Sequence, residues 1–219
     1  MTCALAPSSC ACEDLPDLDG ASAEDILGWA VDAFASDVAV ACSMQDAVLV
    51  DLAARVAPGI EVFFLDTGFH FPDTLATADA VEARYDVRLV RLRPAAPAVA
   101  EYWREGVDAC CYARKVAPLE AYLRDKRAWV SGLRRAESPT RARARALEWD
   151  HRRELVKVNP LVAWSDEDVE RYIADHDIVV NPLLSQGYGS VGCWPCTAPG
   201  EGREGRWPGT ARLECGLHS

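Results

Sequence analysis

The sequence predicts an α/β protein built on a doubly wound, mostly parallel β-sheet. Two observations carry this prediction. Short runs rich in apolar and β-branched residues, as buried parallel strands are, occur at 37–42, 60–66 and 87–92. Longer stretches with helical spacing of apolar residues lie between them, at 44–58 and 72–86. The order β-α-β-α-β needs crossover helices, and it therefore predicts helices on both faces of one sheet.

Helix-capping patterns indicate where two further helices begin. Ser22 and Asp25 form a capping-box pattern ahead of the apolar run ILGWAVDAFA, so a helix is expected to begin at Ser22. Ser165 and Asp168 repeat the pattern ahead of a second amphipathic stretch. The remaining expected elements are a helix over 110–124, strands over 128–133 and 155–161, and a helix over 165–177.

The chain of 219 residues is expected to form one main domain over residues 21–200, because no linker or internal repeat divides it. Residues 1–20 are rich in Ala, Pro, Ser and Asp without a clear period, which predicts a loose tail. Residues 201–219 follow a Gly- and Pro-rich stretch and predict a mobile C-terminal segment.

Three loops should meet at one edge of this sheet, since ligands of open parallel sheets bind beyond the carboxyl ends of the strands. They are CSMQD (42–46), LDTGFHFPDT (65–74) and GLRRAESPTR (132–141). Each supplies polar groups, and backbone N–H groups at a following helix N-terminus suit a phosphate. Alone, each loop is equally well explained as ordinary turn chemistry. Together they indicate a site for a nucleotide-sized anion.

The formal net charge of −11 argues against nucleic acid as a partner. The charge is uneven, because residues 114–157 hold 13 Lys and Arg against 6 Asp and Glu, a net of +7, so the rest of the chain carries −18. This basic segment indicates an anion site, although TRARARAL (140–147) alone is typical of a solvated helical face. No apolar run approaches the ~20 residues that span a membrane.

Nine cysteines, with no signal peptide at the start, predict a cytoplasmic protein whose cysteines serve metal or thiol chemistry rather than disulfides. Cys193 and Cys196 form a CxxC motif, and Cys110 and Cys111 form an adjacent pair. Four thiolates suit zinc or an iron–sulfur cluster. Adjacent cysteines fit the paired spacing of structural zinc poorly, which favours a cluster and leaves the metal open.

The other cysteines have different expected roles. Cys3, Cys10 and Cys12 fall in the loose tail and are expected to be bystanders. Cys42 ends an apolar strand and is expected to be a packing residue. Cys215 lies next to a glycine in the terminal sequence ECGLHS. An exposed thiol oxidises easily, so a thiol in a mobile segment indicates a chemical task.

Several motifs together resemble one family, the assimilatory adenylylsulfate (APS) reductases, the iron–sulfur branch of the APS/PAPS reductase family. The similarity runs from about residue 36 to the end of the chain. The cysteine pairs together with ECGLH are its specific part. The motifs are FLDTGFHFPDT (64–74), CCYARKVAPL (110–119), GLRRAESPTR (132–141), GCWPC (192–196), EGREGRW (201–207) and ECGLH (214–218).

The resemblance implies an ATP-pyrophosphatase-like fold and a [4Fe–4S] cluster on Cys110, Cys111, Cys193 and Cys196. It implies that Cys215 attacks the sulfur of APS, forms an S-sulfocysteine and expels AMP. Thioredoxin then releases sulfite and leaves oxidised. The expected substrate-binding residues, taken from the motifs and from cations suited to sulfate and phosphate oxygens, are Lys115, Arg134, Arg135, Arg203, Arg206, Leu65, Thr67, Ser43 and His218.

Alternatives remain at this stage. A PAPS reductase differs only by recognising a 3′-phosphate. An ATP-pyrophosphatase-type enzyme needs a Ser/Gly-rich loop, which CSMQD is not; many members of the reductase family also have a glycine there. A cluster- or zinc-binding redox regulator accounts for four cysteines but not for the arginines and Cys215 together. Homo-oligomers are compatible with the sequence.

Overall fold

A six-stranded β-sheet forms the centre of the protein in the computed structural model, which describes residues 15–95, 106–210, 212, 214, 216 and 217. The strand order is β3-β2-β1-β4-β6-β5. All neighbouring pairs are parallel except β5 with β6. The predicted mostly parallel sheet is therefore confirmed. The strands are β1 (Val38–Ala41), β2 (Ile60–Leu65), β3 (Val87–Leu92), β4 (Ala128–Val130), β5 (Leu147–Asp150) and β6 (Leu155–Val158).

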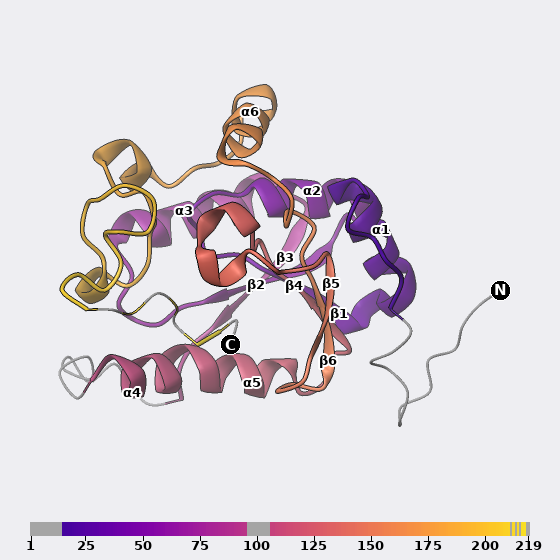
Figure 1. Ribbon diagram of the computed structural model, residues 1–219, viewed down its shortest axis with the longest axis horizontal. Helices are drawn as coiled ribbons and strands as arrows, with labels where there is room; N and C mark the ends of the chain where they lie inside the picture. The colour runs from indigo at the N-terminus through magenta and orange to yellow at the C-terminus, as the bar shows by residue number, and fades with distance from the viewer. Residues whose placement is uncertain (1–14, 96–105, 211, 213, 215, 218–219) are drawn as a thin grey trace.

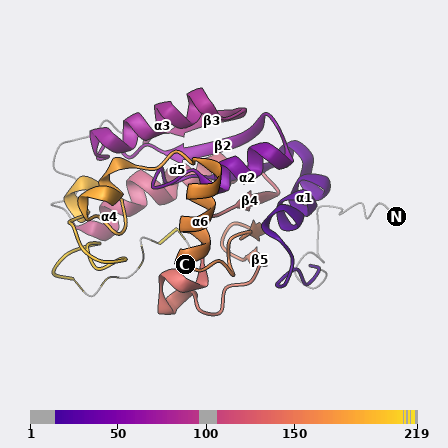
Figure 2. The same ribbon diagram turned by 90° about the horizontal axis from the view of Figure 1, so that it is seen from above.

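Helices cover both faces of this sheet (Figures 1 and 2). Helices α1, α2 and α3 lie over one face, and α4 and α5 run along the other. Alternate residues of each strand serve the two layers: Val38 and Val40 pack with α1 and α2, whereas Ala39 packs with α5. The helices are α1 (Ala23–Phe34), α2 (Val48–Val56), α3 (Pro72–Arg84), α4 (Val107–Cys111), α5 (Ala117–Leu123) and α6 (Asp166–His176).

Both predicted helix caps are present. The Ser22 hydroxyl accepts a hydrogen bond from the Asp25 N–H at 3.1 Å. The Ser165 hydroxyl accepts from the Asp168 N–H at 3.1 Å, and the Asp168 carboxylate accepts from the Ser165 N–H at 2.9 Å. These caps satisfy N–H groups that the first turn of each helix leaves without a partner.

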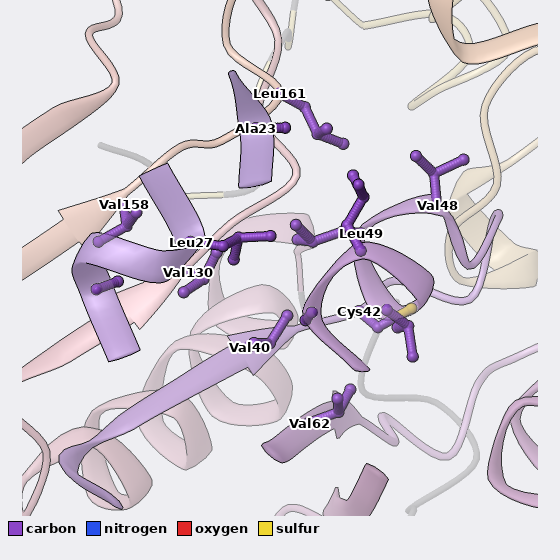
Figure 3. Packing of buried hydrophobic residues seen from close by; sticks show 14 of the residues in the cluster. Ala23, Leu27, Val40, Cys42, Val48, Leu49, Val62, Val130, Val158 and Leu161 are labelled. Carbon is purple, nitrogen blue, oxygen red and sulfur yellow. The ribbon is translucent and has the colours of Figure 1, made fainter. Parts of the chain in front are cut away.

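The larger core cluster lies between the sheet and helices α1 to α3. Figure 3 shows Leu27 and Leu49 packing among strand residues such as Val40 and Val130. Cys42 lies in this cluster, and burial raises the pKa of its thiol to about 12. A buried thiol with so high a pKa is unreactive at neutral pH, which agrees with the packing role expected for Cys42.

Strand β5 and the preceding loop differ from the sequence prediction. β5 was not predicted, and the expected helical face over 140–147 is wrong. A 3₁₀ turn over Pro139–Arg141 leads instead into irregular chain and then β5. The reason is tertiary: the Asp19 carboxylate accepts a hydrogen bond from the Ala146 N–H at 2.7 Å and pairs with Arg145. Arg141 is buried rather than solvated.

One edge of the sheet collects the three predicted ligand loops, because β1, β2 and β4 are parallel and end there. A long irregular segment, 182–210, lies at this end beside α4 in both views (Figures 1 and 2). It joins the loop after β2 through the isolated β-bridge of His70 with Cys193, and Val180, just before the segment, pairs with Asp46 of the loop after β1. Among the described residues, no helix combines the length and apolar character that crossing a membrane requires.

Candidate active site

Four cysteines line one cavity at this edge. Cys110 and Cys111 end helix α4, whereas Cys193 directly precedes the 3₁₀ turn Trp194–Cys196 and Cys196 is its last residue. Although the two pairs are far apart in sequence, all four side chains border the same cavity. The other lining residues are Phe69, Val107, Arg114, Lys115, Pro195 and Trp207.

Local backbone geometry brings each pair to the cavity. A π-helical turn over Tyr112–Val116 follows the adjacent cysteines directly, and such turns are frequent at functional sites. Arg114 and Lys115 lie within this turn and line the cavity together with Cys110 and Cys111. On the other side, Pro195 supports a tight turn closed by the Cys196 N–H donating to the Cys193 carbonyl at 2.9 Å.

The loop after β2 holds the CxxC motif. The Trp194 N–H donates to the Phe69 carbonyl at 2.8 Å. The Thr67 hydroxyl oxygen lies 3.2 Å from the Cys193 sulfur and also accepts from the Phe69 N–H at 3.2 Å. Either atom can donate while Cys193 is a thiol, but once that sulfur is a thiolate, as in a metal site, only the hydroxyl can donate. Thr67, expected to bind substrate, therefore contacts a cysteine of the cavity.

Arg114 is a site residue that the sequence prediction did not name. Its guanidinium Nη1 donates to the Thr67 carbonyl at 2.8 Å and its Cζ lies 4.4 Å from the centre of the Phe69 ring. Only 2% of Arg114 is exposed. Its place in the motif between Cys111 and Lys115 was the available signal. The buried cation lies where four thiols would gain negative charge on ionisation.

Burial and mutual repulsion disfavour the ionisation of several cysteine thiols in the cavity at once. Burial, followed by the neighbouring Cys193 thiol, raises the pKa of Cys110. Burial and Cys193 likewise raise the pKa of Cys196. Lys115 acts against both increases, and it is the cation common to the two pairs. Metal coordination is the usual way to stabilise such a group of thiolates.

Four cysteines at one cavity can serve as ligands for a metal centre. Among the described residues, no three His, Cys, Asp or Glu side chains converge closely enough to hold one metal ion. The four sulfurs instead border a shared cavity. A [4Fe–4S] cluster takes one thiolate at each of four irons, so its ligands surround a volume rather than a point.

A second group of basic residues lies in the C-terminal segment. Arg206 donates to the Ser190 hydroxyl at 3.3 Å, and its Cζ lies 4.7 Å from the Trp207 ring centre. Gly192 makes room for this side chain, because a Cβ there would meet the Arg206 guanidinium at 2.4 Å. The guanidinium of Arg206, an expected substrate-binding residue, therefore lies against Gly192, the residue that precedes Cys193.

Arg203 lies with two residues that the sequence prediction did not name, Arg141 and Glu214. The Arg141 guanidinium binds both carboxylate oxygens of Glu214, with two distances of 2.8 Å. Arg203 approaches the same carboxylate at 3.4 Å. Burial raises and the arginines lower the pKa of Glu214, for a net decrease. Arg141 belongs to the GLRRAESPTR motif and Glu214 to ECGLH, so the motifs contained both residues without indicating their contact.

The structure separates the two arginines of the GLRR sequence. Arg134 pairs with Asp166 at 2.7 Å and acts electrostatically on the buried carboxyl of Asp46, in the loop after β1. Arg135 points elsewhere: its Nε donates to the Ala144 carbonyl at 2.7 Å, and its guanidinium lies 3.5 Å from Asp19. Arg134 thus lies near a predicted ligand loop, whereas Arg135 contacts the N-terminal segment.

The remaining predicted residues occupy varied positions. Ser43 is exposed in the 42–46 loop, next to Met44, which adopts a positive φ of 61°. The Leu65 carbonyl lies 2.8 Å from the His70 ring nitrogen Nε2 at the end of β2. Cys215 and His218, like Cys3, Cys10 and Cys12, fall outside the described residues.

Comparison with known proteins gives a consistent family. The phosphoadenosine phosphosulfate reductase domain matches residues 37–199. Proteins named adenosine 5'-phosphosulfate reductase from Mycobacteroides abscessus and Rhodococcus opacus are 48% and 47% identical. The matches cover 93% and 92% of this chain and 90% of each relative. The one from Mycobacterium tuberculosis strain H37Rv is 47% identical, over 93% of this chain and 91% of its own.

Solved structures agree on the fold. Phosphoadenylyl-sulfate (PAPS) reductase from Candida auris superposes with a TM-score of 0.70 at 24% identity, over 83% of this chain and 92% of that one. FMN adenylyltransferase from Candida glabrata gives a TM-score of 0.62 at 12% identity, over 81% and 64%. At these identities the likeness concerns the fold alone, and it confirms the expected ATP-pyrophosphatase-like class.

Proposed function

The chain belongs to the phosphoadenosine phosphosulfate reductase domain family, and from that premise we propose that it reduces adenosine 5'-phosphosulfate to sulfite and AMP in assimilatory sulfate reduction. The relatives named adenosine 5'-phosphosulfate reductase match over nine-tenths of the chain. The observation that carries the proposal is the cavity lined by four cysteines together with Arg114 and Lys115. A redox regulator would account for the cysteines, but it would not account for the family match or for the two cations beside them.

We further propose that Cys110, Cys111, Cys193 and Cys196 hold a [4Fe–4S] cluster. When bound, the cluster would supply a fixed local charge and a structural link between α4 and the CxxC turn. The protein residues around it support this assignment, since Thr67 offers a hydrogen bond to one sulfur and buried Arg114 offers positive charge. The five cysteines in the described parts of the chain are all free of disulfides, which suits a reducing cytoplasm.

Cys215 is the proposed nucleophile. Its thiolate attacks the sulfur of APS, a new S–S bond forms, and the S–O bond to AMP breaks with the electron pair leaving on the AMP phosphate. The product on the protein is an S-sulfocysteine. A thioredoxin thiolate then attacks the Cys215 sulfur, sulfite leaves, and the second thioredoxin thiol resolves the mixed disulfide. Thioredoxin ends oxidised and Cys215 returns as a thiolate.

Cations near the substrate serve two needs of this reaction. They stabilise the Cys215 thiolate, and they bind the sulfate and phosphate oxygens whose charge shifts as AMP leaves. Lys115 and Arg206 are suited to this task, because both exert their charge on the same cavity cysteine, Cys196. Arg203 belongs to the same basic group beside Trp207. Each guanidinium offers paired donors that match phosphate or sulfate oxygens.

Mass spectrometry tests the proposal directly. Anaerobically purified protein is mixed with APS without reductant, and the peptides are measured for a gain of one SO₃. The adduct is expected on Cys215 and absent from Cys215→Ser. Cys42→Ala, which alters a buried packing thiol, serves as the control and should retain the adduct. Protein with a full cluster and demonstrable AMP binding that forms no adduct would contradict the mechanism.

A further inference from the structure

Glu214 has an unusually complete set of partners for a residue so near the end of the chain. Two Arg141 nitrogens, Nε and Nη2, each lie 2.8 Å from a different Glu214 oxygen. Thr140 adds a hydrogen bond at 3.2 Å, and Arg203 approaches at 3.4 Å. The Arg141 side chain is 9% exposed and that of Glu214 is 19% exposed. The pair is therefore shielded from water, unlike an ordinary surface salt bridge.

Arg141 is committed to protein carboxylates. Its third nitrogen, Nη1, binds Glu137, whose carboxylate also accepts from the Arg134 N–H at 3.2 Å. The Nε and both Nη groups thus each serve a carboxylate, so this guanidinium is a docking point for the chain itself. The series Glu214–Arg141–Glu137 connects the C-terminal segment to the loop that follows β4.

Two further contacts attach the segment to helices α4 and α5. Arg212 binds Asp108, two residues before Cys110, and its Nε donates to the Glu214 carbonyl at 2.8 Å. Leu217 packs against the smaller core cluster, which includes Leu119 of α5. The described residues on each side of position 215 are therefore attached to the protein, and Glu214 carries the largest share of the charge-assisted contacts.

We propose that Glu214 is a positioning residue: its carboxylate anchors the C-terminal segment on Arg141 and Arg203 and thereby presents the adjacent Cys215 to the substrate. This inference rests on the proposed function of Cys215. A nucleophile on a terminal segment loses rate when that segment samples many positions, because the entropy of orienting it must then be overcome in each turnover. A bidentate carboxylate–guanidinium pair fixes both the position and the direction of the chain.

The first test measures docking without any substrate. Trypsin cleavage after Arg212 releases peptide 213–219, and its rate follows the fraction of protein in which this segment is detached. In the cluster-loaded protein, Glu214→Gln is expected to release the peptide about tenfold faster than the wild type, the smallest effect typical of a lost charged hydrogen bond. The matched control is Glu201→Gln, an exposed glutamate in the same segment, which should behave as wild type.

The second test links docking to the reaction. At saturating APS without reductant, the single-turnover rate of adduct formation on Cys215 should fall about tenfold in Glu214→Gln, with the Kd for AMP unchanged. Glu214→Asp keeps the charge and should recover part of the rate. In an Arg141→Lys background, Glu214→Gln should add little, because the bidentate partner is already lost.

Several results would overturn the inference. Equal peptide release from Glu214→Gln and the wild type would mean that Glu214 does not anchor the segment. Faster release with an unchanged adduct rate would mean that the anchor does not position Cys215. Failure of the proposed function looks different, because then even the wild type forms no adduct while peptide release still responds to Glu214→Gln.

Discussion

Replacing Thr67 with valine removes one hydroxyl from beside the cysteine-lined cavity while keeping a branched side chain of similar size. In the structure this hydroxyl has two neighbours. It accepts a hydrogen bond from the buried Phe69 N–H at 3.2 Å and lies 3.2 Å from the Cys193 sulfur. Thr67 is fully buried, so water does not replace either contact. The substitution therefore tests how the β2 loop supports the site.

The magnitude follows from the unsatisfied N–H. A buried donor that loses its acceptor costs about 1 to 3 kcal/mol of stability. For a chain of this size, each kcal/mol lowers the unfolding temperature by about 2 to 4 °C. The loss of a hydrogen bond to the Cys193 sulfur should in addition make the proposed cluster harder to reduce, since such bonds raise cluster potentials by withdrawing charge from sulfur.

Thermal unfolding and redox titration of the cluster-loaded protein measure the two effects. Thr67→Val should lower both the Tm and the reduction potential. Thr67→Ser keeps the hydroxyl and should preserve the potential. Thr77→Val is the matched control, because Thr77 is also buried but donates to the Asp73 carbonyl within α3. It should leave the potential unchanged whatever it does to the Tm.

Two results would refute the reasoning. A Thr67→Val protein with wild-type Tm would show that the Phe69 N–H does not depend on the hydroxyl. A potential that falls equally in Thr67→Ser and Thr67→Val would assign the effect to shape rather than to a hydrogen bond.

Three further predictions concern charged residues. Lys115→Ala should lower turnover and leave the cluster absorbance intact, because Lys115 is a cavity-lining cation and not a cluster ligand; loss of absorbance would indicate a folding role instead. Arg135→Ala should leave the KM for APS within about twofold of wild type, since Arg135 contacts Asp19 and the Ala144 carbonyl, and a large increase in KM would contradict this. Burial raises the pKa of Glu214, but its bonds to Arg141 and the charges of Arg141 and Arg203 lower it overall, below the ordinary value of 4.5. A lowered pKa stabilises the folded state above the unfolded pKa, so the Tm difference between wild type and Glu214→Gln should be constant from about pH 6 to pH 8 and should shrink below about pH 4.5; a difference that shrinks already near neutral pH would contradict the sign.

Local sequence signals were sufficient for most of the scaffold. Strands β1 and β2 are short, mostly apolar and largely buried, as their composition predicts, whereas β3 lies at the edge of the sheet, contains two arginines and is only partly buried. Ser22 and Ser165 marked helix starts because a capping hydroxyl acts within one turn. Strand β5 was missed because its pairing with β6 depends on a partner strand rather than on its own pattern.

The candidate site divides in the same way. Residue type and spacing were enough to nominate the two cysteine pairs, Lys115 and the arginines of EGREGRW, since thiol and guanidinium chemistry belongs to the side chains themselves. The direction of each side chain was not available from sequence. Arg134 and Arg135 are neighbours in the chain, yet one acts on the 42–46 loop and the other pairs with Asp19.

The fold class, the helix starts and the set of reactive groups were predictable from the sequence, because they depend on local propensity, apolar periodicity and side-chain chemistry. Three contacts became visible only in the folded protein: Cys110 and Cys193 share a cavity, Thr67 lies against the Cys193 sulfur, and Arg141 binds Glu214. These contacts join residues far apart in the chain. They depend on how strands and loops pack together, and a local sequence pattern does not show which distant residues will meet.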